Sequence, residues 1–196
     1  AARKTAKKLN LRLKYKIYSI PEAEVIIKKA VKLVGANVVS VGVASVEIAA
    51  AKLAKKDKIK TFFGGLGSEE IFAGYQRHAE AKDVNEECWK GLNAMYGRDF
   101  IRDSKVAAAM KINFLLPYMD KELILAAMAI PAEYKINKNE KKIILRETAV
   151  SVGLPRQFAF RKKLAAQYGS GFDKAIEKLA KKNGFKYKKD YLKSLL

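Results

Sequence analysis

Hydrophobic and polar residues alternate strictly over residues 11–18 (LRLKYKIY), near the start of the chain. Leucine, tyrosine and isoleucine occupy the odd positions, and arginine or lysine stands at positions 12, 14 and 16. A period of two places successive side chains on opposite faces of a β-strand. The pattern therefore predicts a strand with one buried face, after residues 5–10, which read as the final turns of a helix.

The spacing of apolar residues becomes helical after Pro21, which suits a first helical turn because the proline nitrogen has no hydrogen to leave unpaired. This helix is expected to stop at Gly35. A second, alanine-rich helix is predicted from about Ser45 to Lys56. Residues 59–63 (IKTFF) predict a short apolar strand of the kind found in a parallel sheet that is covered on both faces.

The rest of the chain is helical in pattern. The predicted helices cover roughly residues 83–96, 99–112, 120–129, 139–152 and 172–182. No internal repeat or low-complexity linker interrupts the 196 residues. We therefore expect a single domain, 1–196, with an α/β part over 1–75 and a mainly helical part over 76–196.

The charge of the chain is uneven along its length. Forty Lys and Arg residues face 20 Asp and Glu, which gives a formal net charge of +20. Residues 1–60 hold 15 basic and 4 acidic side chains, residues 161–196 hold 11 and 3, and the middle hundred residues hold 14 and 13. Such a charge suits a nucleic-acid partner, but lysines spread over helix faces are more often a solvated surface. We favour the surface interpretation and expect no nucleic-acid partner.

Other classes of protein are excluded by composition. Cys88 is the single cysteine, so neither an intramolecular disulfide nor a cysteine-rich zinc site can form. No apolar run approaches the roughly 18 residues of a membrane span, and the start of the sequence lacks the apolar stretch of a signal peptide. We expect a cytoplasmic protein with no membrane partner.

The segment 62–75 (FFGGLGSEEIFAGY) is the most specific local feature. Gly64 and Gly65 follow a predicted strand, and a helix is expected to begin near Ser68, whose side chain would cap it. Backbone N–H groups at such a turn can bind an anion or a nucleotide, and a carboxylate such as Glu69 or Glu70 can bind Mg²⁺ together with phosphates. A tight structural turn explains the same residues equally well.

A basic segment, RKKLAAQYGSG at 161–171, is the second candidate. Its three consecutive cations could neutralise phosphate charge in a transition state, although a solvated basic loop would have the same sequence. His78 has no partner with a catalytic signature and is expected at the surface or at a helix end. Cys88 is expected to be a small buried apolar group.

Four segments together resemble one family. FFGGLGSEEIFAGY is similar to the G-x-G-x-D-E-x-F-x-G-Y segment of the C-terminal synthetase domain of asparagine synthetases, and RKKLAAQYGSG to its R-x-K segment. Residues 115–136 (LLPYMDKELILAAMAIPAEYKI) resemble its PFLD segment, and residues 140–155 (EKKIILRETAVSVGLP) its K-x-x-L-R helix. The segments follow the family's order, and the resemblance extends over about residues 1–180.

The resemblance implies an α/β fold of the adenine nucleotide α-hydrolase type, with a doubly wound parallel sheet and a helical C-terminal part. It implies an enzyme that activates a small-molecule carboxylate, such as aspartate, by adenylation with ATP and Mg²⁺, and then forms an amide with ammonia. By carry-over, Gly64 and Gly65 contact the nucleotide and the intermediate, Glu69 binds the metal, and Lys163 is catalytic because it stabilises charge on the phosphates. Ammonia could come from solution or from a separate glutamine amidotransferase, and the chain could form a homo-oligomer.

The sequence also departs from the family's pattern. Leu66 stands where the family has an acid, Gly64 stands where a serine is frequent, and Glu69 replaces an aspartate. Asn113 and Leu115 stand where a glutamate and an arginine precede PFLD. These changes keep two alternatives open, a non-catalytic nucleotide-binding relative and an ATP-pyrophosphatase that modifies tRNA.

One part of the family's pattern is not found in the sequence. The S-G-G-x-D-S loop that wraps pyrophosphate, and the first strand before it, would be expected upstream of Ala1. The glutaminase domain with its nucleophilic cysteine is not represented either. We therefore expect the domain to lack its first strand and pyrophosphate loop, and expect that these 196 residues alone could not hydrolyse glutamine.

Overall fold

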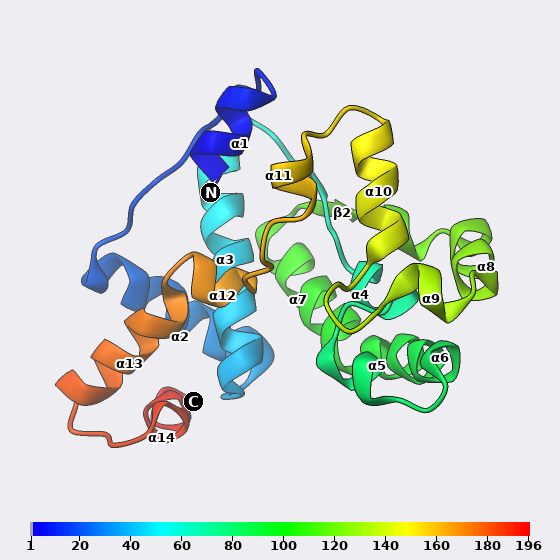
Figure 1. Ribbon diagram of the computed structural model, residues 1–196. Helices are drawn as coiled ribbons and strands as arrows, with labels where there is room; N and C mark the ends of the chain where they lie inside the picture. Colours follow the sequence, from blue (N-terminus) through cyan, green and yellow to red (C-terminus); the bar gives the residue numbers. More distant parts are fainter. Residues whose placement is uncertain (1) are drawn as a thin grey trace. The chain divides into compact units, whose positions relative to one another are not determined.

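Helices dominate the computed structural model of the chain, which describes residues 2–196 (Figure 1). The helices are α1 (Ala2–Lys8), α2 (Ile20–Val34), α3 (Val38–Lys55), α4 (Ser68–Ile71), α5 (Gln76–Glu80), α6 (Val84–Met95), α7 (Ile101–Met110), α8 (Lys121–Ala129), α9 (Ala132–Lys135), α10 (Ile143–Ser151), α11 (Arg156–Ala159), α12 (Ala166–Gly169), α13 (Phe172–Lys182) and α14 (Lys188–Lys193). A π-helical turn, η1 (Tyr96–Phe100), and a 3₁₀ turn, η2 (Pro117–Met119), complete the helical elements.

The sheet contains two strands, β1 (Thr61–Phe63) and β2 (Asn113–Leu115). The N–H of Asn113 donates to the carbonyl of Lys60, and the N–H of Gly64 donates to that of Leu115, so the pairing advances in the same direction on both strands. A parallel strand is therefore confirmed within the predicted range 59–63, but only over Thr61–Phe63. The prediction that it is covered on both faces is wrong, because Thr61 and Phe63 are exposed. The doubly wound sheet is not confirmed, because only these two strands form among residues 2–196.

The predicted strand at 11–18 is wrong in this structure. The segment is extended, but no backbone hydrogen bond joins residues 12–18 to other backbone groups in the described part of the chain. Its alternating apolar residues face solvent, with Leu11 61% and Ile17 79% exposed. A strand needs a neighbouring strand to complete its hydrogen bonds, so an alternating sequence without such a neighbour remains an unpaired extended segment.

The helix predictions are confirmed for most of the chain, and side-chain caps explain their ends. Ser19 accepts a hydrogen bond from the N–H of Glu22, whose carboxylate accepts one from the N–H of Ser19 in return, which forms a capping box before α2. Gly35 ends α2 with a φ of +77°. Helix α3 begins well before the predicted Ser45, because Asn37 accepts a hydrogen bond from the N–H of Ser40.

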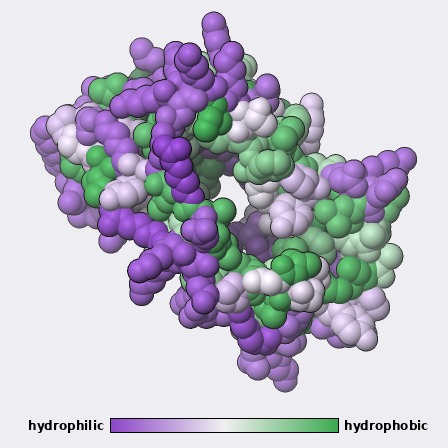
Figure 2. Space-filling model, turned by 90° about the horizontal axis from the view of Figure 1, so that it is seen from above, coloured by the Kyte–Doolittle hydropathy of each residue, from purple (hydrophilic) through white to green (hydrophobic). Residues whose placement is uncertain are grey.

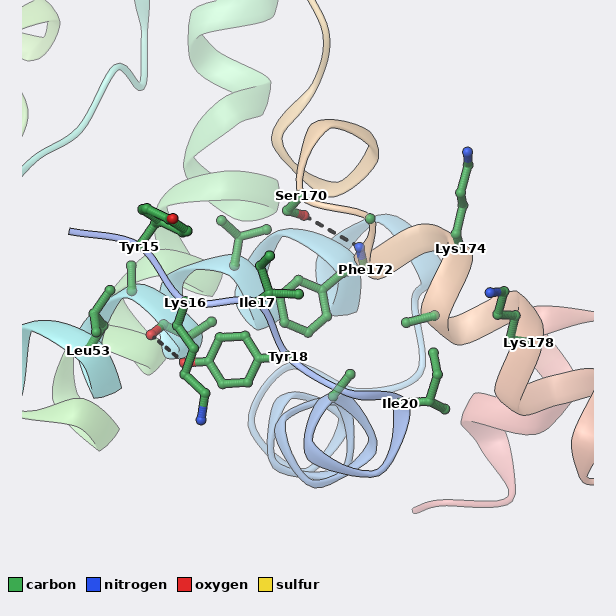
Figure 3. A pocket seen from close by; sticks show the side chains of 16 residues that line it. Tyr15, Lys16, Ile17, Tyr18, Ile20, Leu53, Ser170, Phe172, Lys174 and Lys178 are labelled. Carbon is green, nitrogen blue, oxygen red and sulfur yellow. Dashed lines mark hydrogen bonds between the residues drawn. The ribbon is translucent and has the colours of Figure 1, made fainter. Parts of the chain in front are cut away.

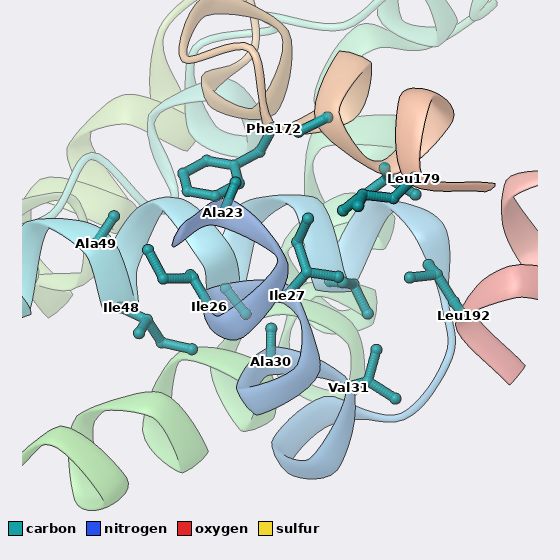
Figure 4. Close-up of a cluster of buried hydrophobic side chains, with 14 of the residues drawn as sticks. Ala23, Ile26, Ile27, Ala30, Val31, Ile48, Ala49, Phe172, Leu179 and Leu192 are labelled. Atoms are coloured by element: carbon teal, nitrogen blue, oxygen red, sulfur yellow. The ribbon is translucent and has the colours of Figure 1, made fainter. Parts of the chain in front are cut away.

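The chain forms two compact units, which we describe separately. Unit 1 comprises the chain up to Thr61, Ile101–Asn113 and Lys163–Leu196. Its core lies between α2, α3, α7, α13 and α14, as Figure 4 shows for much of the cluster. The largest contributions come from aliphatic and aromatic side chains that are almost fully buried, including Ile26, Ile27, Val31, Val41, Ile48, Ile176, Leu179, Tyr191 and Leu192.

Unit 2 comprises Phe62–Phe100 and Phe114–Lys162. Its smaller core is built from the segment around α4 together with α6, α8 and the start of the segment after α9, and it contains Ile71, Phe72, Ala73, Cys88, Ala127, Met128 and Ile136. The glycine-rich turn and the K-x-x-L-R helix both belong to this unit. The single domain expected over residues 1–196 stays a prediction.

No single helix in the described part of the chain is long and apolar enough to cross a membrane. Helices α2 and α3 would reach that length and apolarity only as a pair, and the pair is bent by 118° at the break between them.

Candidate functional site

The glycine-rich turn begins where β1 ends. The backbone N–H of Gly64 donates to the carbonyl of Leu115 at 2.8 Å. A Cβ atom on Gly64 would lie 2.7 Å from Cδ2 of Leu116, so a larger residue here would require the Leu116 side chain to move. A Cβ on Gly65 would meet nothing within 4 Å. Open space therefore lies beside Gly65, at the position where the sequence predicts contact with a nucleotide.

The helix predicted after this turn is much shorter than expected. Gly67 precedes α4 with a φ of +95°, and α4 is a single turn of four residues. The predicted cap by Ser68 is wrong, because its hydroxyl donates instead to Oε2 of Glu69 at 2.9 Å. One turn cannot build a substantial helix dipole. Anion binding at this site would depend on individual backbone groups and on cationic side chains.

Glu69 forms a well-buried ion pair. Its Oε1 lies 2.8 Å from Nζ of Lys142, and the two side chains are 13% and 16% exposed. Gly74 allows this position of Glu69, because a Cβ on Gly74 would lie 2.9 Å from the Cα of Glu69. The turn therefore presents a carboxylate whose partner cation comes from the K-x-x-L-R segment. Sequence reasoning gave Lys142 no role, although its motif was the signal that could have identified it.

Glu70 is directed to a different environment from Glu69. It is fully buried, Nη2 of Arg98 lies 3.5 Å from its Oε1, and Tyr75 donates a hydrogen bond to it. Burial raises the pKa of the Glu70 carboxyl above its usual range, while the hydrogen bond from Tyr75 acts in the opposite direction. Arg98 also pairs with Asp99 at 2.6 Å, within the π-helical turn. Glu70 therefore supports the turn from inside unit 2 and is not available to a metal.

Arg146, the arginine of the K-x-x-L-R segment, holds the backbone that leads into the basic cluster at 161–163. Its Nε donates to the carbonyl of Lys141 at 2.8 Å, and its Nη1 donates to the carbonyls of Ala159 and Arg161 at 3.0 and 3.3 Å. Since the guanidinium holds backbone carbonyls on both sides of Phe160, it fixes the direction in which the chain leaves α11. Arg146 is a positioning residue that sequence reasoning missed.

The predicted site residues divide between the two units. Gly64, Gly65 and Glu69 lie together in unit 2, whereas Lys163 is exposed and begins the last segment of unit 1. The proximity of Lys163 to Glu69 stays a prediction.

The donor set is sparse for a metal ion. No group of three or more His, Cys, Asp or Glu residues that could hold a metal is found among residues 2–196. Both oxygens of Glu69 have partners, Lys142 and Ser68. Mg²⁺ is commonly held by one or two carboxylates together with substrate phosphates. The residues therefore fit Mg²⁺ only when phosphate oxygens complete its coordination and Glu69 exchanges a partner.

The sequence predicted His78 at the surface or at a helix end. It is fully buried, so the surface position is wrong, but it does lie in the first turn of the short helix α5. Its Nδ1 accepts a hydrogen bond from the backbone N–H of Tyr75 at 3.1 Å, which leaves the proton on Nε2. Burial lowers the pKa of His78 to about 4. The imidazole is therefore neutral near pH 7 and structural. Cys88 is buried in the core of unit 2, as expected.

Most residues that depart from the resemblance lie in unit 2, and Asn113 lies in unit 1. Leu66 is partly buried, and Leu115, where an arginine was expected, is 46% exposed. Phe63, at the end of β1, is 80% exposed. Leu66 and Leu115 in unit 2 are therefore apolar where the resemblance calls for charged residues.

Comparison with known proteins identifies the family of the chain. The family described as Asparagine synthase matches residues 1–84 and 78–188, which together cover nearly the whole chain. The chain belongs to the asparagine synthase family. A putative glutamine-hydrolysing asparagine synthetase of Methanocaldococcus jannaschii is 31% identical to it over 96% of this chain and 42% of the relative.

Two further relatives show the same relationship over shorter segments. Glutamine-hydrolysing asparagine synthetase B of Escherichia coli is 34% identical over 58% of this chain and 21% of the relative. Glutamine-hydrolysing asparagine synthetase 3 of Arabidopsis thaliana is 30% identical over 58% of this chain and 22% of the relative. The chain spans less than half the length of these asparagine synthetases.

Proposed function

We propose that this chain is a synthetase domain of asparagine-synthetase type, which adenylates a small carboxylate with ATP and then forms an amide with ammonia. The observation that carries the proposal is the buried pair of Glu69 and Lys142 beside the open space at Gly65. It places a carboxylate and a cation at a glycine-rich strand end, in a member of the asparagine synthase family. That combination suits a site for a nucleotide polyphosphate.

The proposed reaction has two steps. A carboxylate oxygen of an aspartate-like substrate attacks the α-phosphorus of ATP, and the bond to pyrophosphate breaks as pyrophosphate leaves with the electron pair. Ammonia then attacks the acyl carbon, AMP leaves with the former carboxylate oxygen, and the amine loses a proton to solvent. The products are an amide, AMP and pyrophosphate.

We assign a separate role in this reaction to each of the proposed site residues. Gly64 and Gly65 let the nucleotide approach the backbone closely. Lys163 offsets the negative charge that develops on the leaving pyrophosphate, and Lys142 does the same from the turn when Glu69 releases it. Mg²⁺ bound with ATP would be held by Glu69 and phosphate oxygens, and would further neutralise the leaving group.

The nitrogen source belongs to the proposal as well. The named relatives are glutamine-hydrolysing enzymes. We propose that free ammonia, or ammonia from a glutamine amidotransferase, reaches the acyl-adenylate. Comparing ammonium with glutamine as the nitrogen donor for the full-length protein distinguishes these two sources.

A second candidate function is nucleotide binding without turnover. The apolar residues Leu66 and Leu115 support it, because they replace charged groups at the strand ends. In this case Glu69 and Lys142 would form a permanent structural pair. No corresponding structural observation favours a tRNA-modifying enzyme.

The test is exchange of labelled pyrophosphate into ATP by the full-length protein, with and without aspartate. We expect aspartate-dependent exchange that is lost in Lys163→Ala and retained in the matched variant Lys138→Ala, since Lys138 is an exposed lysine outside the proposed site. ATP binding in a calorimeter without aspartate-dependent exchange would favour the second candidate. Full exchange by Lys163→Ala would reject the role of that lysine.

A further inference from the structure

Unit 1 contains an apolar pocket that is separate from the glycine-rich turn. Its volume is about 530 Å³, within the range of small-molecule sites. Four parts of unit 1 enclose it: the extended segment 15–18, the start of α2, one face of α3, and the start of α13 (Figure 3). The lining residues are Tyr15, Lys16, Ile17, Tyr18, Ile20, Ala23, Val46, Ala49, Ala50, Leu53, Ser170, Gly171, Phe172, Lys174, Ala175 and Lys178.

The charged residues at this pocket are all cations. Lys16, Lys174 and Lys178 line it, and no Asp or Glu does. Lys16 is paired with Glu22 at 2.7 Å. Lys174 and Lys178 lie one turn apart on α13, and neither forms an ion pair in the part of the chain that the structure describes. Two cations at the rim therefore remain available to an anionic group.

The first turn of α13 adds to this charge. Ser170, Gly171 and Phe172 line the pocket, and Gly171 begins the helix without a side-chain cap. The positive end of an eleven-residue helix therefore faces the pocket. Phe172 fills part of the floor with its ring, while its N–H donates weakly to the hydroxyl of Ser170 at 3.4 Å (Figure 3).

The excess of basic over acidic residues is concentrated in unit 1. Unit 1 holds 27 basic and 8 acidic side chains, whereas unit 2 holds 13 and 12. Lysine accounts for 24 residues of unit 1 and for 8 of unit 2. A general preference for lysine would affect both units alike. Hydrophilic side chains also cover much of the surface visible in Figure 2.

We propose that the pocket binds an amphiphilic anion, namely a carboxylate with a medium-length aliphatic or an aromatic body. The body lies against the apolar floor, on Val46, Ala49 and Leu53 of α3, and the carboxylate lies at the rim with Lys174 and Lys178. Charge complementarity selects this occupant over a second copy of the chain, because two copies of unit 1 would repel each other strongly. The site is independent of the proposed ligase activity.

The experiment is a calorimetric titration of the chain with sodium octanoate at constant ionic strength, with octan-1-ol as the uncharged probe of the same length. We expect saturable binding of one octanoate, and binding of octanol that is about tenfold weaker or more. Equal affinity for both probes would overturn the charge argument. Absence of saturable octanoate binding would overturn the proposal as a whole.

Three variants test whether octanoate binds in this pocket. Ala50 is exposed at the pocket wall, so Ala50→Trp should fill the space without disturbing the core and should abolish octanoate binding. The double variant Lys174→Glu, Lys178→Glu should weaken binding about tenfold, and Lys182→Glu on the same helix but outside the pocket should change it less than about twofold. Unchanged binding in Ala50→Trp, or equal losses in the charge variants, would place octanoate elsewhere and overturn the proposal. Binding that falls as protein concentration rises would show that a second copy occupies the pocket, and would also overturn it.

Discussion

Breaking the ion pair between Glu69 and Lys142 should cost more free energy of unfolding than breaking an exposed pair with a similar N–O distance. Unit 2 provides the matched comparison, the pair of Glu147 and Arg156. Its atoms lie 3.0 Å apart in a bidentate arrangement, but the side chains are 47% and 63% exposed. Glu69 and Lys142 are 2.8 Å apart and only 13% and 16% exposed. The exposed pair has more hydrogen bonds, so a larger coupling in the buried pair would be due to its burial.

The magnitude follows from this difference in burial. Exposed pairs are worth roughly 0.2–1 kcal/mol in double-mutant cycles because water screens them. Removing one partner of a fully buried pair costs about 3–5 kcal/mol, since an uncompensated charge remains. With more than four fifths of each side chain buried, we expect a coupling of about 2 kcal/mol for Glu69 with Lys142, and less than about 1 kcal/mol for Glu147 with Arg156.

The assay is urea unfolding of the single and double variants of each pair, Glu69→Gln with Lys142→Met and Glu147→Gln with Arg156→Met. The cycle removes effects that each residue has alone, such as the contact of Arg156 with the Phe160 ring. A coupling for Glu69 and Lys142 no larger than that for the exposed pair would refute the view that the turn holds a desolvated charge pair.

Four further outcomes follow from the same structure. The pKa of His78 is about 4 in the folded chain and 6.5 when unfolded, so the unfolded chain binds a proton more readily. The free energy of unfolding should therefore fall by up to about 3 kcal/mol as the pH drops from 6.5 to 4. A His78→Gln variant that shows the same pH dependence in denaturant titrations would contradict this prediction. Arg146→Ala should lower the free energy of unfolding by about 2–3 kcal/mol and speed amide exchange near Phe160, whereas unchanged exchange there would reject its positioning role. Gly74→Ala should lower the free energy of unfolding by about 1–3 kcal/mol, because the new Cβ would overlap the backbone of Glu69. Gly65→Ala should change thermal stability little, because nothing lies within 4 Å of its Cβ position. Equal losses of melting temperature in both variants would contradict the close contact between Gly74 and Glu69. The amides of residues 12–18 should exchange with solvent at nearly unprotected rates in mass spectrometry, and strong protection in the chain alone would show a pairing that the structure does not contain.

Local sequence signals predicted the helices well because their causes are local. Helix α13 was predicted over 172–182, where it is found, since a periodic apolar face and the following Asn183 and Gly184 fix it without help from distant residues. The start of α3 was missed because the cap at Asn37 gave a weaker signal than the glycine at position 42. That glycine is tolerated inside the helix because Gln167 packs against it, where a Cβ would lie 2.9 Å away.

Features that depend on distant partners could not be predicted in the same way. The alternation at 11–18 is typical of a strand, but strand formation also needs a neighbour, and none pairs with it among the described residues. The short strand β2 was missed because its three residues become a strand only beside β1. In the site, the glycine-rich turn was identified from its residues, whereas Lys142 and Arg146 gained roles only through contacts with residues distant in sequence or across a loop.

The central proposal is that a carboxylate is adenylated before the amide forms. Its most direct test is incubation of the full-length protein with ATP, ammonium and aspartate labelled with ¹⁸O in the side-chain carboxylate, followed by mass spectrometry of the nucleotide product. The proposal predicts AMP that carries one ¹⁸O atom in its phosphate, formed in step with the amide. Amide formed with unlabelled AMP, or with ADP and phosphate in its place, would contradict it.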